Sequence, residues 1–338
     1  MNPNSDAVLN LAVDRARSGQ CLERKEALVL IQAKGDVLEE LFEAASLMRD
    51  RAKGRIVTFS KKIFLPLTNL CRNYCGYCTF RKDPGEPGAK TMTPDEVLEV
   101  VGAGEQLGCK EALFSLGDKP ELIFPELRQT LAQLGHRTTI AYLRHICQRV
   151  LDESSLFPHV NPGVMSGRDL RELREVSVSM GIMLESVGLR LLKRGGPHFS
   201  APDKHPRWRL RTIEEAGRLQ IPFTTGLLIG IGETLQERVD SLLAIRDLHD
   251  RYGHIQEVII QNFRAKPDIP MRRHPEPTLE DLTRTVAVAR LIFGGQMNIQ
   301  APPNLACDRQ TEGEETDNPA ILNPLRALLR AGINDWGG

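Results

Sequence analysis

The sequence lacks an excess of charge of either sign, because 44 Lys and Arg residues balance 44 Asp and Glu residues. A chain without a net field has no general attraction for nucleic acid or for an anionic membrane, so neither is expected as a partner. It also lacks long apolar runs: the N-terminus MNPNSDAVLNLAVDRARSG is polar, and no stretch approaches the length that spans a bilayer. These absences predict a cytoplasmic, enzyme-sized protein.

Seven cysteines is an odd number, and four of them stand singly among apolar neighbours. We expect these four to be small buried hydrophobic residues without a function; they are Cys21, Cys109, Cys147 and Cys307. The other three, Cys71, Cys75 and Cys78, lie in the run NLCRNYCGYCTFR with the spacing Cys-x3-Cys-x2-Cys. Three thiolates at this spacing can hold three irons of a [4Fe–4S] cluster and leave the fourth iron open for chemistry.

Three other interpretations of the cysteine run stay open from spacing alone. Positions 71, 75 and 78 share one face of a helix, so a buried stripe is one of them, although Asn73 and Gly76 disfavour it. A zinc site needs a fourth ligand, and no His or Cys follows within thirty residues. A disulfide is unexpected in a chain without a secretory signal.

The rest of the chain is built from periodic segments. Residues 5–52 have apolar positions at helical spacing, and from Arg55 onward strand-like and helical runs alternate, which is typical of repeated β-α units. Capping sequences predict helix starts at Thr93, Thr212 and Thr278. The predicted strands are residues 63–67, 111–116, 160–165, 182–187, 223–231, 258–263, 298–301 and, less regularly, 333–336.

These units predict an α/β fold, a (β/α) TIM-type barrel that is whole or slightly open, with an N-terminal helical extension. A doubly wound sheet is the competing architecture, but the chain has no dinucleotide fingerprint. We expect the extension at residues 1–54, the core barrel at 55–305 and a barrel-closing segment at 306–338, with a polar surface loop at 306–320. Active sites of barrels form at the carboxyl ends of the strands, and the cysteines directly follow the first predicted strand.

The cysteine run resembles the motif of the radical S-adenosylmethionine (SAM) superfamily. In that superfamily the cysteines hold a [4Fe–4S] cluster, SAM binds the open iron, and an electron cleaves SAM to methionine and a 5'-deoxyadenosyl radical. The resemblance implies that SAM contacts follow the other predicted strands. The implied SAM-binding residues are Tyr77, Gly117, Asp118, Glu185, Arg209 and Gly230.

Most of these residues also have a simpler explanation. Gly117 and Asp118 stand where the superfamily has a glycine-rich element that meets the methionine amino group, but Gly-Asp is also an ordinary turn. Glu185 ends an apolar strand and either contacts SAM or pairs with an arginine of the barrel. Tyr77 occupies an aromatic position that the superfamily uses near adenine, whereas Gly230 belongs either to an adenine-contacting motif or to a tight turn.

Arg209 lies in PRWRLRTIEEAG, ahead of the fifth predicted strand. The resemblance implies that its forked guanidinium binds the SAM carboxylate. Arg207 and Arg211 are close rivals for that role, and a solvated basic face is the alternative for all three.

Longer strings carry a more specific resemblance. FLPLTNLCRNYCGYCTFRKDP, FSLGDKPE, HVNPGVMS, GLLIGIGET, VIIQNFRAKPDIPM, NIQAPPNL and GINDWGG resemble the CofG component of 7,8-didemethyl-8-hydroxy-5-deazariboflavin (FO) synthase, from about residue 57 to the end. The resemblance implies a radical SAM lyase that closes the deazaflavin ring with loss of ammonia. The implied substrate is an adduct that a second, CofH-type radical SAM enzyme makes from tyrosine and 5-amino-6-ribitylaminouracil, and an external donor supplies the electron.

The chain departs from this family in two ways. It carries one cysteine motif where fused members carry two, so we expect the stand-alone component, and it stops at Gly338 where members usually continue. From this early stop we expect either an incomplete eighth strand or a trimmed chain. The rivals are another biotin-synthase-like radical SAM enzyme, such as a tyrosine lyase or a menaquinone-pathway enzyme, and a non-catalytic iron–sulfur or zinc protein.

Substrate contacts are less constrained by the sequence. Gln261, Asn262 and Gln300 are amides at strand ends that could pair with a uracil edge. His159 and His205 could move protons during ammonia loss. Ordinary polar loop positions explain these five residues as well, so no residue is assigned as catalytic.

Overall fold

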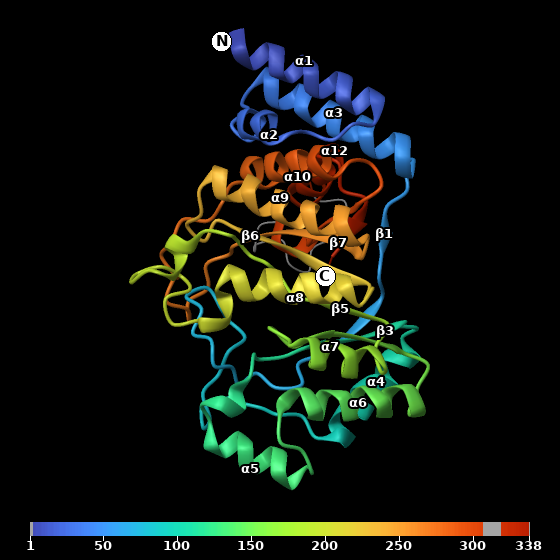
Figure 1. Cartoon of the computed structure of the whole chain (residues 1–338), viewed down its shortest axis with the longest axis vertical. Helices are drawn as coiled ribbons and strands as arrows, with labels where there is room; N and C mark the ends of the chain where they lie inside the picture. The colour runs from blue at the N-terminus through green and yellow to red at the C-terminus, as the bar shows by residue number, and fades with distance from the viewer. Residues whose placement is uncertain (1–2, 307–318, 338) are drawn as a thin grey trace.

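The computed structural model describes residues 3–306 and 319–337, and its centre is one curled sheet of nine strands (Figure 1). All neighbouring strands run parallel, in the order β1-β9-β8-β7-β6-β5-β4-β3-β2. The strands are β1 (Thr58–Phe59), β2 (Lys62–Leu65), β3 (Glu111–Ser115), β4 (Phe157–Asn161), β5 (Ser179–Gly181), β6 (Phe223–Ile229), β7 (Ile255–Asn262), β8 (Asn298–Ala301) and β9 (Asp335–Trp336). The two edge strands, β1 and β2, are consecutive in the chain, with only two residues between them, so the two edges of the sheet must lie close together. The sheet therefore curls into a slightly open (β/α) barrel, and the predicted fold class is confirmed.

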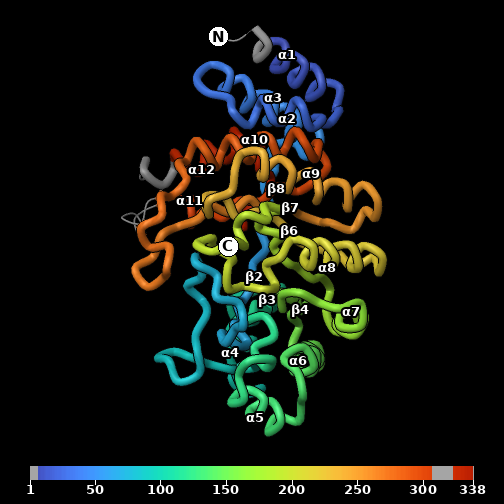
Figure 2. The backbone as a smooth tube through the Cα atoms, turned by 60° about the vertical axis from the view of Figure 1, so that its left-hand side comes forward, coloured from blue at the N-terminus to red at the C-terminus, as the bar shows by residue number. Residues whose placement is uncertain are grey.

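Helices follow the strands and cover the outside of the sheet (Figures 1 and 2). The helices that come after β2 in the chain are α4 (Pro94–Gln106), α5 (Pro125–Gln133), α6 (Thr139–Glu153), α7 (Gly167–Arg174), α8 (Pro206–Arg218), α9 (Leu235–Tyr252), α10 (Leu279–Phe293), α11 (Pro303–Ala306) and α12 (Pro319–Arg330). Short 3-10 turns, η1 (Pro120–Leu122), η2 (Leu189–Leu192) and η3 (Pro202–Lys204), lie in the loops. The alternation buries the apolar outer face of each strand against a helix.

Three helices precede the sheet, as the apolar spacing of residues 5–52 predicts. They are α1 (Pro3–Ser18), α2 (Arg24–Leu30) and α3 (Asp36–Lys53). Figure 2 shows them beyond α10 at one end of the molecule, with α3 packed on α1 and α10 and α2 packed on α9. The helical extension therefore adds a second layer outside the barrel helices, far from the cysteine loop.

Two sequence expectations about element boundaries are wrong. Thr212 does not start a helix: α8 begins at Pro206 behind the N-cap His205, and the Thr212 hydroxyl donates to the carbonyl of Trp208 within the helix. The fourth predicted strand, 182–187, ends instead at Gly181. Beyond it Glu185 takes a left-handed conformation (φ 65°), which leaves only an isolated bridge to the next strand.

A surface loop is expected at 306–320, and its residues 307–318 lie outside the described residues.

The other two capping predictions are confirmed. Thr93 and Thr278 cap α4 and α10, and each side chain accepts a hydrogen bond from the backbone N–H three residues on.

Candidate active site

The three clustered cysteines lie on the loop that follows β2, at the carboxyl end of the sheet. The loop is held by backbone hydrogen bonds to distant segments: Tyr74 N–H donates to Ser200 (2.9 Å) and Gly76 N–H to Pro197 (2.8 Å). The N–H of Met271 donates to the carbonyl of Gly76 (3.0 Å). A loop without regular structure is therefore fixed on both sides, which keeps its sulfurs on one wall of a single cavity.

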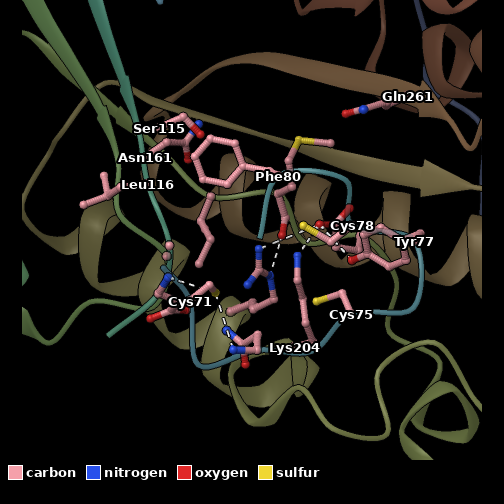
Figure 3. Close-up of a pocket in the computed structure, with 18 residues that line it drawn as sticks. Cys71, Cys75, Tyr77, Cys78, Phe80, Ser115, Leu116, Asn161, Lys204 and Gln261 are labelled. Atoms are coloured by element: carbon pink, nitrogen blue, oxygen red, sulfur yellow. Dashed lines mark hydrogen bonds and ion pairs between the residues drawn. The ribbon is translucent and has the colours of Figure 1, made fainter. Parts of the chain in front are cut away.

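Cys71, Cys75 and Cys78 line this cavity, whose volume is about 340 Å³ (Figure 3). The sulfur of Cys71 accepts backbone hydrogen bonds from Asn73 (3.4 Å) and Asp118 (3.2 Å). Such N–H···S contacts are the means by which proteins stabilise and tune thiolate-bound iron–sulfur clusters. The donor set and its surroundings fit a [4Fe–4S] cluster.

A single metal ion fits the same residues poorly. In the part of the chain that the structure describes, no group of three or more His, Cys, Asp or Glu side chains is close enough to hold one ion. Zinc needs its ligands to converge on one point at about 2.0–2.3 Å, whereas a cubane holds each thiolate on a different iron. Three cysteines without a converging fourth ligand therefore match a cluster with one open iron better than a tetrahedral zinc site.

Five of the six implied SAM-binding residues line the cavity with the cysteines: Tyr77, Gly117, Asp118, Glu185 and Arg209. The sixth, Gly230, does not. It has a φ of 86°, its N–H donates to Glu233 (2.8 Å), and a side chain there would collide with Pro277. The turn explanation accounts for a glycine at this position, because only glycine adopts this φ without strain.

Glu185 is the centre of a buried charge cluster. Its carboxylate accepts a hydrogen bond from Lys204, lies 4.0 Å from the guanidinium of Arg209, and is 3.4 Å from the hydroxyl of Tyr77. Burial alone would raise the pKa of Glu185, but the two cations hold it below its usual value. The residue is therefore an anion at neutral pH, with its neighbours at the cavity wall.

Tyr77 is fixed by this cluster. Its hydroxyl lies 3.1 Å from Nε2 of His198, and the two rings meet edge to face. Burial raises the pKa of Tyr77 well above its ordinary value, so the hydroxyl stays protonated.

The three arginines that the sequence could not rank have different surroundings. Arg209 is buried and donates to the carbonyls of Met183 and Asp203, whereas Arg207 and Arg211 are exposed. Only Arg209 of the three lines the cavity.

Lys204 is a cavity residue that the sequence analysis missed. It stands in the loop that carries η3, outside every motif and period, so no local signal marks it. Its ammonium group pairs with Glu185 and lies 5.7 Å from the ring centre of Tyr77. It gives the cavity a second cation beside Arg209.

Gly117 and Asp118 lie against the start of the cysteine loop. A Cβ at Gly117 would sit 1.8 Å from the carbonyl oxygen of Leu70, so the two backbones touch only because the residue is glycine. Asp118 is buried, which raises its pKa, and its carboxylate accepts from Lys119 (3.0 Å) and from the N–H of Val164 (3.1 Å).

The structure separates the candidate substrate residues. Gln261 lines the cavity, while the amide of Asn262 donates to Leu305 and that of Gln300 to Glu257 and Asp335. The two histidines are also engaged elsewhere. His159 is buried 2.7 Å from the Ser179 hydroxyl, and His205 caps α8.

The fold and site define a radical SAM enzyme, and comparison with known proteins gives the same class. The family model "Radical SAM superfamily" matches residues 65–245, more than half of the chain, so the chain belongs to that superfamily, whose cofactors are a [4Fe–4S] cluster and SAM. Within it the chain belongs to the 7,8-didemethyl-8-hydroxy-5-deazariboflavin synthase family. It is 48% identical over 283 residues to the protein of that name from Methanopyrus kandleri, covering 84% of this chain and 80% of that one.

Longer relatives extend the same family. "FO synthase" from Streptomyces avermitilis is 49% identical over 337 residues, which are 97% of this chain and 37% of the relative. The Mycobacterium tuberculosis FO synthase is 46% identical over 99% of this chain and 40% of its own length. This chain thus spans about two fifths of the length of these relatives.

Solved structures bear on the fold alone. The [FeFe]-hydrogenase maturase HydG superposes with a TM-score of 0.77 at 18% identity, covering 98% of this chain and 67% of its own. Methylornithine synthase (PylB) gives 0.72 at 19% identity, covering 96% and 85%. None of the helices within residues 3–306 and 319–337 combines the length and apolar character needed to cross a bilayer.

Proposed function

We propose that this chain catalyses the ring-closing step of deazaflavin coenzyme biosynthesis. The substrate is the adduct 5-amino-5-(4-hydroxybenzyl)-6-(ribitylimino)-dihydrouracil, and SAM is consumed with it as the two-electron oxidant. The products are FO, ammonia, methionine and 5'-deoxyadenosine, which makes the enzyme a carbon–nitrogen lyase. One observation carries the proposal: the three cysteines share a cavity with a buried Glu185–Arg209 pair in a chain 48% identical to a deazariboflavin synthase.

In this proposal Cys71, Cys75 and Cys78 hold the [4Fe–4S] cluster. When bound together, the cluster and SAM supply a 5'-deoxyadenosyl radical that abstracts a hydrogen atom from the substrate. The hydrogen-bonded N–H groups of Asn73 and Asp118 orient the Cys71 thiolate.

SAM binds along the same wall. Arg209 orients its carboxylate by a charge-assisted contact, and the close backbone at Gly117 and Asp118 receives its amino group. Glu185 holds Arg209 and Lys204 in place, and the protonated Tyr77 hydroxyl borders the nucleoside. The substrate, once bound in the cavity, shields the radical from water.

The adduct comes from a second, CofH-type radical SAM enzyme. The FO synthases that this chain matches extend far beyond the matched part, which supports a division of the work between this chain and another catalytic unit. Because thiolates that hold a cluster must stay reduced, the enzyme works in the cytoplasm.

The electron comes from an external, acidic donor protein. Exposed cations on the two segments that bond to the cysteine loop support this; they are Lys193, Arg194, Arg272 and Arg273, and they outnumber the one exposed carboxylate that the described residues place beside them, Asp268. Charge complementarity of this kind speeds association.

The test is reconstitution. Reduced enzyme, SAM and authentic adduct should give deazaflavin fluorescence without any partner, whereas tyrosine and 5-amino-6-ribitylaminouracil should give it only with the partner enzyme present. SAM cleavage without deazaflavin from authentic adduct would refute the proposed substrate.

A further inference from the structure

The concave face of the sheet is not filled by side chains. On β2, Ile63 points outward against Gly104 of α4, so its neighbour Phe64 faces the inside of the barrel. The Phe64 side chain is nevertheless 50% exposed. Barrel interiors of this type are normally packed with bulky residues, so an exposed aromatic ring there marks a hollow.

The lower end of this hollow, near the starts of the strands, is polar and internally hydrogen-bonded. Glu257 on β7 accepts from the hydroxyl of Thr224 (2.9 Å) and the amide of Gln300 (3.0 Å), and Gln300 also donates to Asp335 (2.7 Å). Lys62 faces the same group from β2. These residues form the polar floor of the barrel interior, and their own hydrogen bonds already pair them.

The upper end, beside the cysteines, carries polar side chains of a different kind. Ser115, Asn161 and Gln261 stand at the ends of β3, β4 and β7 and line the cavity together (Figure 3). Within the described residues no hydrogen bond of the Ser115 hydroxyl or of the two amide groups exists, in contrast to the bonded floor. Side-chain amides half-hidden in a cavity and left unpaired are suited to a ligand that supplies the missing partners.

A uracil ring supplies such partners. Its edge alternates carbonyl acceptors and N–H donors, and a carboxamide offers one acceptor and two donors in the complementary arrangement. The two amides belong to strands that are not neighbours in the sheet, so they can approach one ring from different sides.

Resting on the proposed function, we infer that Asn161 and Gln261 bind the uracil ring of the substrate at the cysteine end of the hollow, with Ser115 beside them. The ribityl chain then runs past the exposed Phe64 ring toward the polar floor, away from the cysteines. This orientation holds the reacting part of the substrate next to the cluster wall and its polyol tail away from it.

The test measures the binding of two ligands, each monitored by its own fluorescence. One is the product FO, and the other is an FO analogue with a methyl group in place of the ribityl chain. Asn161→Ala and Gln261→Ala should each weaken both ligands by about the same factor, on the order of tenfold. Phe64→Ala should weaken FO and leave the methyl analogue unchanged. Gln148→Ala, on the exposed face of α6, is the control and should change neither.

Cluster absorption and the far-UV circular dichroism signal report whether each variant is folded. If Asn161→Ala does not fold, Asn161→Leu repeats the measurement with a side chain of similar shape. Unchanged affinity in the Asn161 and Gln261 variants would overturn the ring site while leaving the proposed function intact. An equal effect of Phe64→Ala on both ligands would overturn the placement of the tail. Absence of FO binding to the unaltered enzyme would instead count against the proposed function itself.

Discussion

Asp203 accepts two parallel hydrogen bonds from the guanidinium of Arg72, the residue that follows the first cysteine. The Asp203 side chain is 5% exposed, and its backbone N–H donates to the side chain of Asn73 (3.0 Å). The loop that carries η3 is thereby tied to the cysteine loop across 130 residues of sequence. Burial would raise the pKa of Asp203, but Arg72 and Lys119 hold it below its usual value, so it stays charged.

Removing this pair should therefore loosen the cysteine loop. Asp203→Ala leaves a largely buried guanidinium without its partner and should lower the free energy of unfolding by about 3 kcal/mol, with faster loss of iron. The matched control is Asp240→Ala, since Asp240 forms the same two-armed pair with Arg24 on the surface (2.8 and 3.1 Å) and should cost less than about 1 kcal/mol. Denaturant unfolding and iron release measure both; equal effects would contradict the structural role of Asp203.

The cysteine assignment predicts an all-or-none response. Cys75→Ala should lose the visible absorption of the cluster and all SAM cleavage, because within the described residues no other cysteine lines the cavity. Cys147→Ala, buried in α6, should retain both properties. Formation of 5'-deoxyadenosine by Cys75→Ala at the parent rate would disprove the assignment.

Arg209 should contribute to SAM affinity. Arg209→Ala is expected to weaken SAM binding by about 1.5–3 kcal/mol, the contribution of a hydrogen bond to a charged group, while the cluster survives. Equilibrium binding of SAM to the reconstituted protein measures this. Arg207→Ala is the control and should bind SAM as the parent does, because Arg207 is exposed and does not line the cavity.

Gly117 should not tolerate a side chain. Gly117→Ala would place a methyl group 1.8 Å from the Leu70 oxygen and 2.8 Å from Cβ of Cys71, so the cysteine loop must move and the cluster should be lost. Gly102→Ala, on α4 with nothing within 4 Å, should instead raise the free energy of unfolding by about 0.5–1 kcal/mol. Iron content and thermal unfolding distinguish the two; a Gly117→Ala protein with full iron content would refute the close-contact argument.

Stability should fall in mild acid through His159. Burial lowers the pKa of His159 to about 4, against about 6.5 in an unfolded chain. Between these values the unfolded state binds a proton that the folded state does not, so the free energy of unfolding decreases by about 1.4 kcal/mol per pH unit as pH falls from 6.5 to 4.

His159→Gln should remove this contribution and make the pH dependence less steep over the same window, where burial also lowers the pKa values of His198 to about 3 and His254 to about 4 and so adds slopes of the same sign. Urea unfolding of the metal-free protein at several pH values measures the slope without interference from cluster loss. Parallel slopes for the two proteins would show that His159 does not titrate as its burial implies.

The sequence by itself determined the fold class and the cysteine wall of the site. The barrel follows from the alternation of strand and helix periods, and the cysteines and Gly117 are local signals that closely follow strand ends. These features are encoded within a few neighbouring residues, so they can be read without knowing which segments meet.

The tertiary structure decided which of several residues of the same type reach the cavity. Arg209 rather than Arg207 or Arg211 reaches the cavity because the orientation of α8 buries that one face. Lys204 and Asp203 join the site only because η3 folds back against the cysteine loop. The Asn262 amide donates to the carbonyl of Leu305, whereas Gln261 lines the cavity, because successive side chains of a strand point to opposite faces. Only the curvature of the barrel determines which of the two faces is the inner one.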